Sequence, residues 1–88
     1  MSWAQAEFHD LELGDARRTQ RLIKLVNDLS AQPTGSIPLA CGGWPETKAA
    51  YRLLDNPAVE WREILEVHTT RTVARMAGQP VVLCLQDT

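Results

Sequence analysis

Residues 13–36, LGDARRTQRLIKLVNDLSAQPTGS, carry the strongest helical pattern in the chain. Asp15 is a suitable N-cap, and Pro33 followed by Gly35 is a stop signal. Between them, apolar side chains recur at spacings of three and four residues, which places them on one stripe of an α-helix. They are Leu22, Leu25, Val26 and Leu29. The sequence therefore predicts a helix over residues 15–31 with one apolar face.

The next segment predicts two more helices joined by glycines. Ser36 can cap a single turn that ends at Cys41, and Gly42 with Gly43 permits a sharp reversal. Pro45 suits the first turn of the following helix. The side chains that this helix is expected to turn inward are Ala49, Ala50, Leu53 and Leu54. Together these elements have the outline of a helix-turn-helix, an outline that also arises by chance in helical domains.

A further helix and a strand are expected in the last third of the chain. The helix covers EWREILEVHTTRTVARMAG, residues 60–78, with Trp61 as a core anchor and His68 as a hydrogen-bonded structural residue. Residues 81–85, VVLCL, read as a strand buried on both faces, but no neighbouring strand precedes them. The expected organisation is a helical domain over residues 1–78 and a strand within residues 79–88.

Composition limits the classes of protein to consider. Eighty-eight residues form one small domain with a modest core. No apolar stretch is long enough for a membrane span and the N-terminus does not resemble a signal peptide, so we expect a cytoplasmic protein without a membrane partner. In that compartment Cys41 and Cys84 are expected to remain unpaired, and the two histidines lack metal-binding spacing.

The net charge of −2 conceals an uneven distribution of charge. Residues 17–24 hold four basic side chains and no acid, which makes this helix face a candidate for phosphate binding. The candidate DNA-contacting residues are Arg17, Arg18, Arg21 and Lys24 here, and Thr47, Lys48, Tyr51 and Arg52 on the glycine-preceded helix. The alternative for both sets is an ordinary solvated helix face, with Tyr51 as a core aromatic at the rim.

One acidic residue is a candidate metal ligand. Asp87 follows the predicted strand, and a carboxylate at a strand end is a common metal ligand in α/β enzymes. A single carboxylate does not hold Mg²⁺ by itself, because the ion needs further ligands. A solvent-facing aspartate is therefore the alternative interpretation.

Three stretches together resemble a known group of enzymes. LGDARRTQRLIKLVNDLSAQP, SIPLACGGWPETKAAYRLLDNP and the closing QDT, in this order and spacing, are similar to the N-terminal region of bacterial insertion-sequence transposases of the insertion-sequence-4 group, which includes the Tn-five-like enzymes. The similarity extends from about Trp3 to Thr88.

The resemblance implies a fold and a function. In that group a helical domain binds the terminal inverted repeats of the transposon during cut-and-paste transposition. An RNase H-like domain follows, in which two aspartates and a glutamate hold Mg²⁺ or Mn²⁺. Asp87 matches the first aspartate, so the resemblance implies that residues 79–88 hold the first strand of a catalytic domain that is otherwise missing.

The fold class that follows is mainly α, a small helical bundle with a helix-turn-helix-like segment and one strand. We expect double-stranded DNA as the partner, a nucleoid-associated location, and neither catalysis nor a cofactor in this 88-residue chain itself. The alternatives are a truncated regulator that associates with full-length transposase through protein contacts, and a remnant without function.

Overall fold

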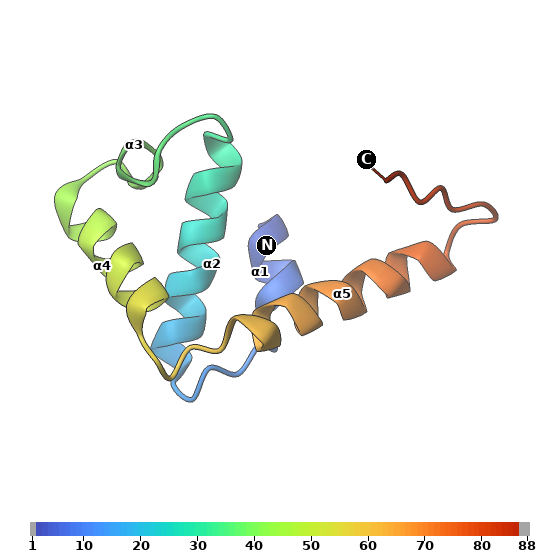
Figure 1. Cartoon of the computed structure of the whole chain (residues 1–88), viewed down its shortest axis with the longest axis horizontal. Coiled ribbons are helices and arrows are strands. Elements are labelled where there is room, and N and C mark those ends of the chain that lie inside the picture. The colour runs from blue at the N-terminus through green and yellow to red at the C-terminus, as the bar shows by residue number, and fades with distance from the viewer. Residues whose placement is uncertain (1, 87–88) are drawn as a thin grey trace.

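The computed structural model describes residues 2–86 and is mainly helical (Figure 1). Within these residues the chain forms five α-helices and no strand. Their bounds are α1 Trp3–Phe8, α2 Ala16–Ala31, α3 Ile37–Cys41, α4 Trp44–Asp55 and α5 Trp61–Ala77. The mainly helical fold class predicted from the sequence is confirmed, and so is the order of short helix, glycine turn and longer helix.

Local signals in the sequence define where the helices begin. The Asp15 carboxylate accepts a hydrogen bond of 2.8 Å from the Arg17 backbone N–H, which caps α2 as predicted. The Ser36 hydroxyl likewise accepts from the Leu39 N–H and caps α3. Gly42 ends α3 at a φ of 81°, a left-handed conformation that glycine adopts without strain. Each of these turns is therefore encoded by residues adjacent to it.

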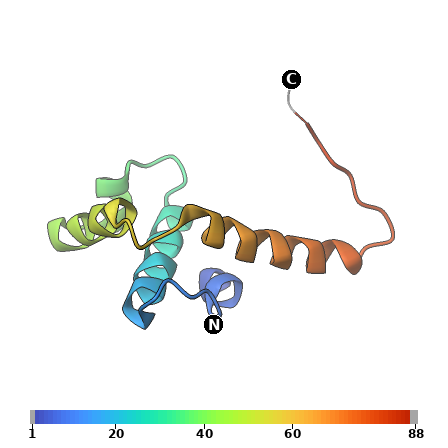
Figure 2. The ribbon, with the colours of Figure 1, turned by 60° about the horizontal axis from the view of Figure 1, so that its bottom comes forward.

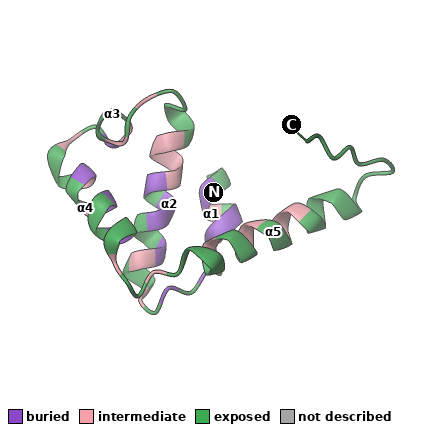
Figure 3. Ribbon diagram, viewed as in Figure 1, coloured by how far each residue is buried: buried purple, intermediate pink, exposed green. Residues whose placement is uncertain are grey.

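The core lies between α2 and the elements that surround it. α2 contacts α1, α3 and α4, and buried positions concentrate on these helices and on the loop before α2 (Figure 3). The core side chains are Ala4, Phe8, Leu11, Leu13, Leu22, Ile23, Leu25, Cys41, Ala50 and Leu53. Two core leucines belong to the irregular loop before α2, so this loop is a packed part of the domain.

Removing the Leu13 side chain should destabilise the domain strongly. Leu13 is 2% exposed, and its truncation to alanine leaves a cavity in a small core, which is expected to cost about 3 kcal/mol. The matched control is Leu54→Ala, because Leu54 was expected to face inward yet is 52% exposed. Chemical denaturation should show a large loss for Leu13→Ala and a small change for Leu54→Ala; equal losses would contradict this description of the core.

α5 is attached to the bundle along one side only. Its one helix partner is α1, and within residues 2–86 none of its residues is buried. Figures 1 and 2 both show α5 running away from α2, α3 and α4. Trp61 is 60% exposed, with the Arg62 guanidinium 4.8 Å from its ring, so the prediction of Trp61 as a core anchor is wrong. The physical reason is that α5 packs against one helix only within residues 2–86, so its other sides stay exposed.

The segment after α5 does not form the predicted strand. Residues 81–86 are irregular and exposed, and within the described part of the chain no strand lies beside them. A strand needs a hydrogen-bonded neighbour, so an apolar β-prone sequence alone does not create one. The strand prediction is not confirmed, and Asp87 lies outside the described residues.

Deleting residues 80–88 should leave the helical bundle intact. The apolar side chains of residues 81–85 are exposed and none belongs to the core cluster, so their removal takes nothing from the core. We expect an unchanged helical circular dichroism signal and melting temperature, with less aggregation in light scattering, because an exposed β-prone segment favours pairing between copies. A large fall in melting temperature would contradict this independence.

Candidate nucleic-acid interface

The outward face of α4 gathers aromatic and basic side chains in one shallow groove. Its lining residues are Trp44, Lys48, Tyr51, Arg52, Asp55 and Asn56, and its volume is about 470 Å³. Most of them are three, four or seven residues apart, which places them on one side of a helix. Trp44 is 72% exposed and Tyr51 is also exposed. The structure therefore brings together three of the four DNA-contacting residues predicted on this helix.

The fourth predicted residue of α4, Thr47, lies on the opposite side. Thr47 is buried beside Ala50 and Leu53, and its hydroxyl donates a hydrogen bond of 2.7 Å to the Gly43 carbonyl. The prediction placed Thr47 next to Lys48 as a group for phosphates or base edges. Because its hydroxyl is satisfied inside the domain, Thr47 serves the packing of α4 and is not presented to a ligand.

The basic side chains of α2 line a second groove. It is formed by Ala16, Arg17, Gln20, Arg21 and Lys24 and has a volume of about 600 Å³. Lys24 pairs with Asp28 at 2.9 Å, whereas Arg21 is exposed and forms no ion pair within residues 2–86. The groove thus presents three cations, of which Arg21 is the least engaged.

Arg17 in this groove is paired with the residue that caps the helix. Its Nη2 lies 3.0 Å from the Asp15 carboxylate. This side-chain hydrogen bond lowers the pKa of Asp15 and raises the pKa of Arg17. Such exposed pairs contribute little to stability and are readily exchanged for other partners. Arg17 is therefore available to a phosphate at small cost.

Arg18 differs from its three basic neighbours. It is half-buried, and its Nη1 donates a hydrogen bond of 2.9 Å to the Leu13 carbonyl. This bond ties α2 back to the loop that precedes it, next to Gly14, which has a φ of 84°. Arg18 therefore has a structural role in the described residues, and it is not among the residues that line the α2 groove.

The two grooves remain separate in the structure. A narrow crevice of about 10 Å³ lies between α2 and α4, lined on one side by Arg21 and Lys24 and on the other by Glu46 and Ala50. The crevice lies between the side of α2 that carries Arg21 and Lys24 and the inner side of α4. Lys48 and Arg52 line the outer groove of α4 instead. The geometry therefore offers two basic surfaces rather than one continuous stripe.

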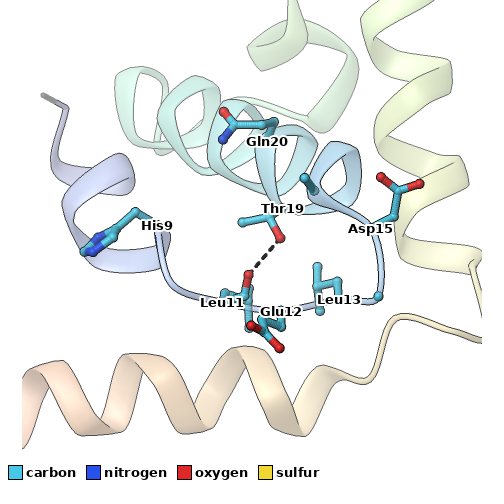
Figure 4. A pocket seen from close by; sticks show the side chains of 9 residues that line it. His9, Leu11, Glu12, Leu13, Asp15, Thr19 and Gln20 are labelled. Atoms are coloured by element: carbon cyan, nitrogen blue, oxygen red, sulfur yellow. Dashed lines mark hydrogen bonds between the residues drawn. The ribbon is translucent and has the colours of Figure 1, made fainter.

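A third hollow lies where the loop before α2 meets that helix (Figure 4). Its polar lining includes His9, Glu12, Asp15 and Gln20. Here the Thr19 hydroxyl donates a hydrogen bond of 2.8 Å to the Leu11 carbonyl, as Figure 4 shows. Two acids and no lysine or arginine line this hollow, so it does not attract phosphate, and its contacts serve to hold the loop against α2.

Comparison with protein families shows the family to which this chain belongs. The model of the transposase DNA-binding family matches residues 1–59, about two thirds of the chain. The chain belongs to this family. DNA is therefore the partner of this domain, and the match contains α1 to α4 with both basic grooves. α5 begins at Trp61, beyond the matched residues.

One feature of this transposase DNA-binding domain was not predicted from the sequence. Glu7 of α1 is buried and accepts hydrogen bonds from Arg75 and His68 of α5. Arg71 of α5 pairs with Asp10 at 2.8 Å beside them. His68 is thus hydrogen-bonded and structural, as predicted. The signal that could have indicated this cluster is the spacing of His68, Arg71 and Arg75 on one helix face, but their acidic partners lie more than 60 residues away.

The described part of the transposase DNA-binding domain shows no candidate metal centre. Within residues 2–86, no three His, Cys, Asp or Glu side chains lie together in a way that could hold a metal ion. The predicted metal ligand Asp87 lies outside the described residues. Over the same residues, no helix combines the length and the hydrophobicity needed to cross a bilayer.

Proposed function

We propose that the domain binds duplex DNA mainly through the outward face of α4, with the α2 groove as a second, phosphate-binding surface. The observation that supports this most directly is the α4 groove, where Lys48 and Arg52 stand beside Trp44 and Tyr51. Cations on a rigid helix neutralise phosphates and release counterions, which supplies affinity for any sequence. The aromatic groups add contacts to sugars and base edges, from which sequence preference arises.

α4 is the helix that we assign to the major groove in a helix-turn-helix arrangement. α3 packs against α4, and both pack against α2, so α4 is braced from behind while its outer face stays free. A recognition helix needs this combination of a supported inner side and an exposed outer side. Arg17, Arg21 and Lys24 then contact the phosphate backbone from α2, whereas Arg18 and Thr47 hold the two helices in shape.

The DNA that we assign to this surface is the terminal inverted repeat of an insertion sequence. The support is the family match together with the three motifs that resemble transposases of the insertion-sequence-4 group. In the full-length parent enzyme, which we take to be a DDE transposase acting by cut-and-paste transposition, Mg²⁺ or Mn²⁺ would supply the phosphoryl-transfer chemistry and Asp87 would be one of its ligands. Transposition would place the protein at the nucleoid.

Fluorescence anisotropy tests this proposal. The 88-residue chain is titrated against two labelled duplexes of equal length, one with the inverted repeat that bounds its element and one with the same bases in scrambled order. We expect tighter binding to the repeat, and affinity for both duplexes that falls steeply with salt. Equal affinity for the two duplexes would overturn the assignment to inverted repeats, and binding without salt dependence would overturn the basic surfaces.

The exposed side of α5 favours a second candidate function, association with full-length transposase. Its exposed apolar side chains are Trp61, Leu65, Val73 and Met76. Association through such a surface is driven by apolar burial and is insensitive to salt, unlike the binding of DNA. Co-sedimentation with full-length transposase at 0.1 and about 0.5 M salt therefore separates the two functions.

A further inference from the structure

Glu7 is a buried carboxylate at the contact between α1 and α5. It is 2% exposed, and its two oxygens accept hydrogen bonds of 2.7 and 3.0 Å from Arg75 Nη1 and Nη2. His68 Nδ1 donates to the same carboxylate. A buried charge is tolerated only when it is paired and hydrogen-bonded, and this bidentate geometry satisfies that condition.

The basic groups around Glu7 all come from α5. Arg71 of α5 donates from Nε to the Glu7 backbone carbonyl at 3.4 Å and pairs with Asp10, which follows α1. The hydrogen bond from Arg75 lowers the pKa of Glu7 to about 2, with His68 contributing in the same direction and burial opposing both. Glu7 therefore stays ionised over the physiological pH range and keeps the charge that pairs with Arg75.

The contacts of α5 differ between its two halves. The first half is held by the linker after α4 and by Ile64 and Val67, which pack against the core. The second half contacts the rest of the domain through polar groups, Arg71 and Arg75, both of which reach Glu7. Because α1 is the one helix that α5 contacts within residues 2–86, these bonds hold α5 to the domain at a point distant from the linker.

We propose that Glu7 is a positioning residue, which sets the direction in which α5 leaves the DNA-binding helices. The direction of α5 is fixed relative to α2 because α1 is itself bonded to α2. The Asn27 side chain of α2 donates a hydrogen bond of 3.1 Å to the hydroxyl of Ser2, the residue that caps α1. The consequence for DNA rests on the proposed function. With α4 on the duplex, a fixed α5 delivers the residues after it to one place relative to the DNA.

Pulsed electron paramagnetic resonance measures this direction. Spin labels are attached at Ser30 of α2 and Thr69 of α5, both exposed, after replacement of Cys41 by Ala and Cys84 by Ser. A narrow distance distribution is expected in this background, and a broader or shifted one after Glu7→Gln. Glu66→Gln is the matched control, since it removes the same charge from an exposed position of α5.

If Glu7→Gln does not fold, Arg75→Gln tests the same proposal. It breaks the same bonds from the α5 side, where Arg75 is half exposed, and it should also broaden the distribution. By carboxyl NMR, the pKa of Glu7 should lie near 2 in the wild type and rise in Arg75→Gln. An unchanged distribution in Arg75→Gln, or an equal change in Glu66→Gln, would overturn the proposal.

DNA affinity separates this proposal from the proposed function. Arg75→Gln lies outside both basic grooves, so the unlabelled variant should bind duplex DNA within about twofold of the wild type. If the wild type itself bound no DNA, the proposed function would fail while the distance result for α5 would stand. A loss of DNA affinity in Arg75→Gln without any change in distance would overturn the positioning role.

Discussion

Replacement of Lys48 and Arg52 together by alanine is expected to weaken binding to duplex DNA by about 30-fold, equivalent to about 2 kcal/mol. Both side chains line the exposed groove of α4, and neither forms an ion pair within residues 2–86 that would have to be broken first. The slope of log K against log salt should decrease by about two, one unit for each lost phosphate contact. Anisotropy titrations at several salt concentrations measure both quantities.

Two controls make this result specific to α4. Arg62→Ala removes an exposed cation from α5, where it lies over the Trp61 ring, and should leave affinity and salt slope unchanged. Arg21→Ala removes the least engaged cation of the α2 groove and should lower affinity for repeat and scrambled duplexes equally. An unchanged slope in the double variant would identify the α4 groove as an ordinary solvated face. A large effect of Arg62→Ala would indicate nonspecific loss of charge.

Much of the fold was predictable because each of the helices α2, α3 and α4 carries its own boundaries. Asp15 and Ser36 cap from side chains adjacent to the turns they close, and Gly42 supplies the left-handed residue that ends α3. These effects act over three or four residues, so sequence spacing alone reports them. The predicted helix over residues 15–31 accordingly agrees with the observed α2 to within one residue.

The parts that were not predicted depend on contacts distant in sequence. α1 has six residues, too few for a periodic signal, and it is stabilised by packing on α2 and α5. Trp61 has the spacing of a core residue, yet within residues 2–86 α5 has one helix partner, and that partner leaves Trp61 exposed. The strand at residues 81–85 was predicted from a short apolar run rich in Val and Leu, but such a run forms a strand only where a sheet exists for it to join.

Within the candidate site, the sequence pattern predicted part of the exposed face of α4 but not all of the side chains that the helix buries. Lys48, Tyr51 and Arg52 line the outer groove, whereas Thr47, predicted to contact DNA, is buried and Leu54, predicted to face inward, is exposed. The difference arises because the Thr47 hydroxyl bonds to the Gly43 carbonyl, so a polar residue enters the core without penalty. Arg18 similarly bonds to the Leu13 carbonyl. The pattern of charges along the sequence does not reveal such hydrogen bonds from a side chain to a nearby backbone carbonyl.

Substitution of Glu7 by glutamine should destabilise the domain by about 2 kcal/mol near neutral pH. Glutamine keeps the shape of the side chain but removes the charge that Arg75 and His68 face. Because Arg75 is half exposed and can turn to water, the loss should stay below that for a fully buried partner. For a domain of 88 residues this corresponds to a fall in melting temperature of about 10 °C. Circular dichroism melts measure it directly, with Glu66→Gln as the neutral control.

The stability that Glu7 contributes should depend on pH, and the pKa of Glu7 gives the direction of that dependence. The folded-state pKa of Glu7 lies at about 2, below the ordinary value of 4.5, so folding favours the ionised form. Its contribution is fully present above pH 4.5 and is lost as the pH falls from 4.5 towards 2. The difference in unfolding free energy between the wild type and Glu7→Gln should therefore shrink as the pH falls from 4.5 towards 2. A difference independent of pH down to about 2 would show that the glutamine acts by disturbing packing rather than by removing a charge.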